Sequence, residues 1–282
     1  MFGVSPAYFI SRYGSDFTPD QIVRGLEALV AMGFDAFQLE VFYPERLDEW
    51  ERSGAAVVGR GAESAGLVPS QFVAHFLLHS FANDAVLSGG GGVEELRRVI
   101  GTLEHFPECR TVTLPIPGIE VAGSSYSILY DATVKKLETM LRIAEDAEVR
   151  LALEILPYAV IGGSDGFLRL VERLNSPWLG YNFDTGHAWA MKERIELLPE
   201  KLAGRIFGTH LCDNDGGINN SWTPGDGTID WTMVMAALSA GSYHGAFDIE
   251  IHCPADQVEA SYRRGREHLL ARGAQSYQST RS

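Results

Sequence analysis

The chain has 282 residues, 45% hydrophobic and 21% charged, a composition typical of a globular protein with a sizeable core. Its 37 acidic and 23 basic residues give a net charge of −14, which disfavours binding to nucleic acids and to anionic membranes. No apolar run approaches the ~20 residues that span a bilayer, and Met1–Ile10 lacks the features of a signal peptide. We therefore expect a cytoplasmic protein whose ligands are small molecules or metal cations.

The three cysteines, Cys109, Cys212 and Cys253, are odd in number and widely spaced, and none belongs to a C-x-x-C motif. This pattern does not form a disulfide framework. Free, reduced thiols are the expectation, in agreement with a cytoplasmic location.

Short strand-like segments alternate with longer helix-like segments along the whole chain. Strands are expected at Phe2–Ile10, Ala36–Phe42, Ser70–Phe76, Cys109–Pro117, Arg150–Pro157, Leu179–Gly186, Ile206–Asp213 and Gly245–His252. Helices are expected at Thr18–Gly33, Glu45–Ala65, Val93–His105, Ala132–Ala147, Gly166–Leu174, Met191–Leu202, Trp231–Leu238 and Ala255–Arg272. Eight such alternations predict an α/β fold, a single (β/α)₈ TIM barrel domain over residues 1–282 with a frayed tail at 273–282. An open doubly wound sheet is the alternative, which the lack of a G-x-G-x-x-G motif after any strand weakens.

Several of the expected strands alternate apolar and polar residues instead of being apolar throughout. In Phe247–His252 the apolar residues share one face, and Asp248, Glu250 and His252 share the other. The apolar face is expected to pack on the helices, so the polar face points into the barrel. Charges in that position are costly unless they are paired or bind a metal, which predicts a site at the carboxyl ends of the strands.

Four residues, Glu154, Asp184, His210 and Glu250, lie at or near the carboxyl ends of the fifth to eighth expected strands. In a closed barrel these ends converge, and three carboxylates beside one imidazole cannot all ionise without a cation. The sequence therefore predicts one divalent cation bound by these four side chains. The oxygen-rich set favours Mn²⁺, with Mg²⁺, Co²⁺ or Zn²⁺ as alternatives.

The same segments resemble the xylose-isomerase-like barrel superfamily and, within it, the sugar (phosphate) isomerase/epimerase branch. That branch includes ketose 3-epimerases, hydroxypyruvate isomerases and inosose dehydratases. The resemblance covers nearly the whole chain and is carried by Gly33–Glu40, Leu153–Pro157, Asn182–His187, Thr209–Gly216, Ile249-Glu250 and the P-G-x-G-x-I-D-W segment Pro224–Trp231.

The resemblance implies a metal-dependent sugar isomerase or epimerase that acts on a small sugar or keto-sugar. Glu154 and Glu250 match the catalytic pair that moves a proton, besides being metal ligands, and His187 matches a histidine that contacts substrate oxygens. Glu40 and His75, near the ends of the second and third strands, are further candidates for substrate binding. Because barrels of this kind often form dimers, a homo-oligomer is the alternative to a monomer.

The same scaffold also supports functions other than isomerisation. A metal-dependent lyase, such as a keto-inositol dehydratase or an enzyme that eliminates from 3-keto-glycosides, would use the same metal and base, and no sequence feature separates it from an isomerase. The superfamily's trinuclear-zinc endonucleases need a D-x-H where this chain has Asn219-Asn220-Ser221. A non-catalytic barrel would have no reason to keep the four-ligand set. No basic residue follows His210 closely, which favours unphosphorylated sugars.

Overall fold

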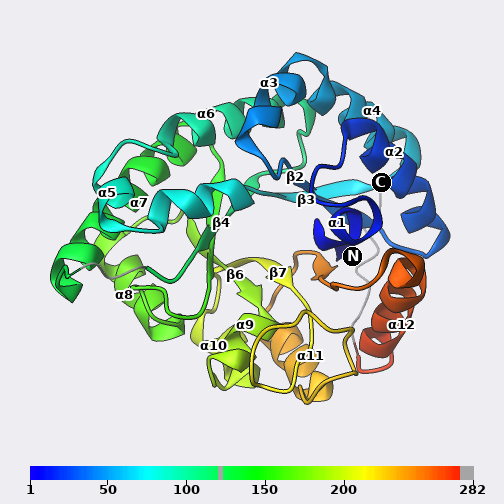
Figure 1. Cartoon of the computed structure of the whole chain (residues 1–282). Coiled ribbons are helices and arrows are strands. Elements are labelled where there is room, and N and C mark those ends of the chain that lie inside the picture. The colour runs from blue at the N-terminus through cyan, green and yellow to red at the C-terminus, as the bar shows by residue number, and fades with distance from the viewer. Residues whose placement is uncertain (120–122, 274–282) are drawn as a thin grey trace.

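The computed structural model describes residues 1–119 and 123–273, so the expected frayed tail lies outside the described residues except for Gly273. In the described part, parallel strands form the centre of the molecule and helices surround them (Figure 1). The strands are β1 (Phe2–Val4), β2 (Ala36–Glu40), β3 (Val68–Val73), β4 (Thr111–Ile116), β5 (Arg150–Ile155), β6 (Leu179–Asp184), β7 (Ile206–His210) and β8 (Phe247–Ile249).

The strands close into a barrel. β2 to β7 pair in sequence order, and β1 pairs with β8. The two sheets join on one side because Leu211, just after β7, pairs with Ile249 of β8, its N–H donating to the Asp248 carbonyl at 2.8 Å. On the other side, Asp35 N–H donates to the Phe2 carbonyl at 2.8 Å. The prediction of a (β/α)₈ barrel is confirmed, and the open doubly wound alternative is wrong.

The helices of the described residues form the outer layer. They are α1 (Ala7–Tyr13), α2 (Pro19–Ala31), α3 (Leu47–Glu49), α4 (Ala55–Ala65), α5 (Asp84–Ser88), α6 (Val93–Thr102), α7 (Tyr126–Asp146), α8 (Ser164–Leu174), α9 (Thr185–Ala190), α10 (Leu198–Lys201), α11 (Trp231–Ala240) and α12 (Val258–Leu270). Short 3₁₀ segments lie at 44–46, 75–81, 103–105, 195–197 and 255–257, and a π-helical turn lies at 50–54. No described helix has the length and apolarity to cross a membrane.

Two of the expected elements differ most from the structure. The strand expected over Phe2–Ile10 ends at Val4, because Ser5 and Pro6 turn the chain and Pro6 lacks the N–H that would continue the ladder. The helix expected over Met191–Leu202 is replaced by α9, which starts earlier, and by short turns that end in α10. α9 begins directly after β6 because the Asp184 side chain accepts the His187 N–H and so caps it.

The barrel interior is polar, as the strand alternation predicts. Gln38, Gln71, Asn182 and Asp248 are all buried within it. Glycine provides the space: a Cβ on Gly208, for example, would lie 2.2 Å from Gln71 Oε1. The apolar side chains of the strands pack outward against the helices and form the core.

Candidate metal centre

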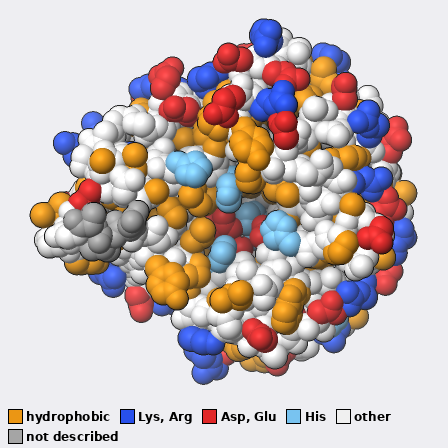
Figure 2. Space-filling model, viewed as in Figure 1, with side chains coloured by type: hydrophobic (Ala, Val, Ile, Leu, Met, Phe, Trp, Pro, Cys, Tyr) orange, Lys and Arg blue, Asp and Glu red, His pale blue; other side chains and the backbone are white. Residues whose placement is uncertain are grey.

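The carboxyl ends of four neighbouring strands bring the predicted ligands together. Glu154 is the penultimate residue of β5, Asp184 ends β6, His210 ends β7 and Glu250 directly follows β8. One potential ligand atom from each residue lies within 4.8 Å of the others. Figure 2 shows a hollow in the middle of this face, with acidic side chains in its depth and histidine side chains around it.

The imidazole of His210 lies among the three carboxylates. Its Nδ1 is 2.6 Å from Glu154 Oε1, 3.0 Å from Glu250 Oε2 and 3.8 Å from Asp184 Oδ2. Three of the four side chains are buried, and that of Glu250 is largely buried. Such concentrated negative charge, shielded from water, provides strong attraction for a cation.

In two of the carboxylates one oxygen is bound by the protein and the other is directed at the centre. Asp184 Oδ1 accepts the His187 N–H at 2.7 Å, whereas its buried Oδ2 has no hydrogen-bond partner. Glu250 Oε1 accepts from Ser221 Oγ at 3.1 Å, and its Oε2 faces His210. An orphaned buried oxygen beside converging ligand atoms fits a divalent cation.

The pKa values reflect this crowding. Burial alone would lower the pKa of His210, but the charges of Glu154 and Glu250 outweigh burial and raise the pKa to about 10. Burial raises the pKa of Asp184 to about 7, and Glu250 and Glu154 act in the same direction. Burial and the charge of Glu250 also raise the pKa of Glu40. The carboxylates thus hold a proton on His210 that a cation would have to displace.

The three residues expected to bind substrate surround the metal cluster. His187, on α9, has its Nε2 3.8 Å from Asp184 Oδ2, and its buried Nδ1 has no hydrogen-bond partner. Glu40 ends β2 inside the barrel with Oε2 unpartnered. His75 lies in the 3₁₀ segment beyond β3 rather than in the strand, and its ring stacks on Phe42 with 5.1 Å between centroids.

The loop after β7 supports two of the proposed ligands, which no pattern in the sequence indicates. Ser221 donates to Glu250, and Asn219 Nδ2 donates to Asp184 Oδ1 at 3.5 Å. These residues occupy the stretch Asn219-Asn220-Ser221, where the endonucleases have a D-x-H. Their role depends on a loop conformation for which the sequence carries no periodic signal.

That loop is organised by the buried carboxylate of Asp213. Its Oδ2 accepts from Gly225 N–H and from the indole Nε1 of Trp231, both at 2.8 Å. Its Oδ1 accepts the N–H groups of Asn214 and Ile229 at 3.0 and 3.2 Å. The segment Pro224–Trp231, which carries part of the family resemblance, thus wraps around Asp213 and has a structural role.

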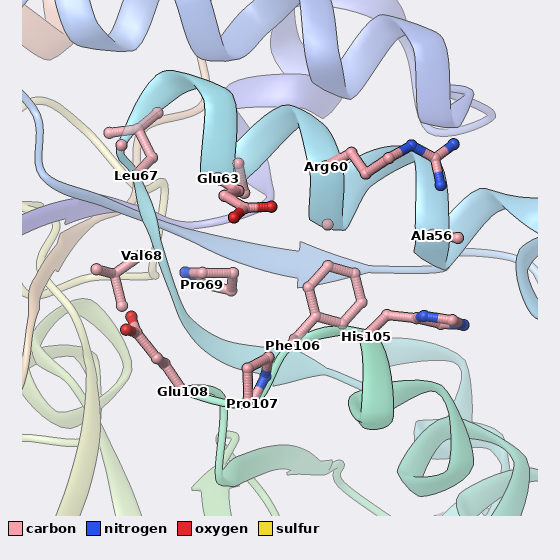
Figure 3. Close-up of a pocket in the computed structure, with 13 residues that line it drawn as sticks. Ala56, Arg60, Glu63, Leu67, Val68, Pro69, His105, Phe106, Pro107 and Glu108 are labelled. Carbon is pink, nitrogen blue, oxygen red and sulfur yellow. The ribbon is translucent and has the colours of Figure 1, made fainter.

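A separate groove of about 570 Å³ lies between α4 and the residues that precede β4 (Figure 3). It includes Val68, the first residue of β3, and Glu108. It is therefore at the amino ends of the strands, opposite the metal cluster, and contains none of the predicted site residues.

Comparisons with known proteins agree with the fold. The family model described as "Xylose isomerase-like TIM barrel" matches residues 26–272. The L-ribulose-5-phosphate 3-epimerase UlaE of Salmonella paratyphi C is 24% identical over 86% of this chain and 87% of its own. A zinc-bound IOLI protein structure superimposes with a TM-score of 0.76 at 16% identity, covering 97% of this chain and 99% of that one. The 3-keto-D-glucoside 4-epimerase YcjR of E. coli gives a TM-score of 0.73 at 16% identity, covering 90% and 96%.

Proposed function

The chain belongs to the xylose isomerase-like TIM barrel family, and we propose that it is a divalent-metal-dependent sugar isomerase or epimerase. The observation that carries this proposal is the convergence of four ligand atoms at the carboxyl ends of β5 to β8. Sugar epimerases among the similar proteins support the same class of reaction. One Mn²⁺ is the proposed ion, because three carboxylates and one imidazole form an oxygen-rich set.

The proposed reaction is the transfer of a proton at a carbon next to a carbonyl group. When bound, the cation would polarise the carbonyl and an adjacent hydroxyl of the sugar and so acidify that carbon. Glu154 and Glu250 come from strands on different sides of the centre, with His210 between them. In this proposal one glutamate removes the proton and the other returns it. His187, Glu40 and His75 would orient the sugar oxygens.

We propose that the substrate is an unphosphorylated sugar. The name of the Salmonella relative, in contrast, specifies a sugar phosphate. In the described part of the chain, Lys192 Nζ near the β7 loop is already bonded to the Gly216 carbonyl. Figure 2 shows the Lys and Arg side chains of this face away from the hollow, toward the edge. A phosphate group is usually bound by such cations or by a helix N-terminus.

Metal content tests the proposed site directly. Wild-type protein reconstituted with Mn²⁺ is expected to retain one equivalent after gel filtration, and Asp184→Asn is expected to retain far less. Asp146→Asn, on the exposed surface of α7, is the matched control and should equal wild type. Equal metal content in wild type and Asp184→Asn would refute the ligand set.

Turnover in D₂O tests the reaction. The metal-loaded protein is incubated with a panel of ketoses, keto-glycosides and their phosphates, and products are read by mass. An isomerase or epimerase gives products of unchanged composition that carry solvent deuterium, whereas a lyase releases water or an aglycone. Glu154→Gln and Glu250→Gln are each expected to lose at least about 100-fold in rate. Glu108→Gln, in the opposite groove, should lose nothing. Turnover without any deuterium incorporation would exclude this proton transfer.

A further inference from the structure

A chain of hydrogen bonds runs from His210 down into the barrel. The Nε2 of His210 lies 2.9 Å from Gln38 Oε1, and Gln38 Nε2 donates to Asp248 Oδ2 at 2.9 Å. Ser70 Oγ donates to the same Asp248 oxygen at 3.0 Å. Gln38 and Asp248 are each 1% exposed, so water does not compete for these bonds.

The direction of the bonds follows from what each group can do. Gln38 Nε2 also donates to the Thr209 carbonyl at 3.3 Å, and a carbonyl can only accept. The amide nitrogen of Gln38 must therefore face Thr209 and Asp248, which leaves its carbonyl oxygen toward His210. A carbonyl oxygen requires a donor, so the hydrogen of a neutral His210 is held on Nε2, and the Nδ1 lone pair points at the carboxylates.

We propose that Gln38 and Asp248 are positioning residues that hold His210 as an Nδ1 metal ligand. The inference rests on the proposed metal site. It assigns a role to two buried polar residues that are neither proposed ligands nor proposed substrate-binding residues. Partners of this kind, which fix the ring and tautomer of a ligating histidine, typically account for 10–100-fold in metal affinity.

The barrel leaves a space beside Gly3 that the side chain of Asp248 fills. Gly3 of β1 pairs with Asp248 of β8, and a Cβ on Gly3 would lie 1.8 Å from Asp248 Oδ1. The carboxylate thus fills the space that a side chain at position 3 would take. Asp248 N–H is held in turn by Thr209 Oγ1 at 3.0 Å.

A second buried glutamine in the same barrel offers a matched control. Gln71 Nε2 donates to Asn182 Oδ1 at 3.1 Å, and its Oε1 accepts from Thr113 Oγ1 at 2.5 Å. Gln71 is as buried as Gln38, but its hydrogen-bond partners within the described residues, Asn182 and Thr113, are not among the four proposed ligands. Gln71→Met therefore reports the general cost of removing an amide from this interior.

The test uses Zn²⁺ as a diamagnetic probe and does not depend on activity. Zn²⁺ affinity is measured by competition with a chelator for wild type, Gln38→Met, Asp248→Ala and Gln71→Met. We expect a 10–100-fold loss for Gln38→Met, a smaller loss for Asp248→Ala because Thr209 still orients the amide, and less than threefold for Gln71→Met. In long-range ¹H–¹⁵N spectra of the zinc-loaded wild type, His210 should carry its proton on Nε2.

The outcomes separate this inference from the proposed function. If wild type binds one Zn²⁺ and Gln38→Met binds it equally well, positioning by Gln38 is refuted while the metal site stands. If wild type binds no Zn²⁺ or other divalent cation, both are overturned. Should Gln38→Met fail to fold, the wild-type spectrum still decides, because a proton on Nδ1 or zinc on Nε2 contradicts the proposed arrangement.

Discussion

Binding of a divalent cation at the four-residue centre is expected to release protons. In the metal-free protein His210 has its pKa raised to about 10 by Glu154 and Glu250, which outweigh burial, and burial raises the pKa of Asp184 to about 7. At pH 7 the imidazole is therefore protonated and the Asp184 carboxyl about half protonated. Both must lose their protons before they can bind a cation through Nδ1 and Oδ2.

The number of protons released follows from the pKa values of these two groups. At pH 7, binding should release about 1.5 protons per cation, about one from His210 and half from Asp184. Between about pH 7 and 10 the affinity should rise about tenfold per pH unit, which corresponds to ~1.36 kcal/mol per unit. Titration calorimetry with Mn²⁺ at pH 6.5–8.5, in buffers of different ionisation enthalpy, measures the proton release directly. A release below half a proton at pH 7, or an affinity independent of pH, would refute the reasoning.

The same protons give the metal-free protein a characteristic pH dependence. Because the pKa of folded His210 lies above its unfolded value of about 6.5, its contribution to the free energy of unfolding is complete below that pH. It is lost as pH rises through about 10. The raised pKa of Asp184 likewise lowers stability as pH rises from about 4 toward 7. The difference in melting temperature between metal-loaded and metal-free protein should therefore widen with pH.

Three substitutions test other parts of the structure. His187→Ala should retain the metal but weaken substrate binding or turnover, measured by metal analysis and KM; joint loss of metal and activity would make His187 a ligand. Lys136→Met should cost about 3 kcal/mol in urea unfolding, because buried Nζ donates to the carbonyls of Ser80, Val86 and Gly91, and a cost under about 1 kcal/mol would contradict this. Asp213→Asn should cost about 3 kcal/mol and reduce Zn²⁺ affinity, because each carboxylate oxygen accepts two N–H groups and the amide NH2 that replaces one oxygen can accept neither. Unchanged affinity would separate the loop from the centre.

The sequence alone could predict the barrel and the grouping of the four proposed ligands. Strand alternation is a local property, and a closed barrel brings every strand end to one rim, so Glu154 and Glu250 could be placed near each other without long-range information. The same reasoning places Asp248 on the polar face of its strand, but it cannot pair Asp248 with Gln38. They are separated by 210 residues, and their bond depends on how β2, β1 and β8 lie in register.

The contribution of the loops was less predictable. α1 and α9 begin at turns where Pro6 and the Asp184 side chain interrupt the strand pattern, and periodicity does not show such local events. The strand expected over Ser70–Phe76 ends at Val73, so His75 lies in the 3₁₀ segment that follows. Ser221 can donate to Glu250 only because Asp213 holds the loop in its conformation. That conformation depends on hydrogen bonds between individual atoms, which leave no pattern in the sequence.

The barrel places its chemistry in two layers that are linked by the strand period of two. On three strands a residue of the polar floor lies two positions before a residue of the site, in the pairs Gln38 and Glu40, Asn182 and Asp184, and Asp248 and Glu250. Backbone hydrogen bonds to the neighbouring strands, or those just beyond the end of the strand, hold the backbone between the two residues of each pair. A substitution of Gln38 or Asp248 therefore removes hydrogen bonds that lead to His210, whereas Asn182 pairs with Gln71 and lies outside that chain. The hydrogen bonds within this floor offset part of the free energy that a buried polar interior costs, and the chain through Asp248 and Gln38 ends on His210 of the candidate centre.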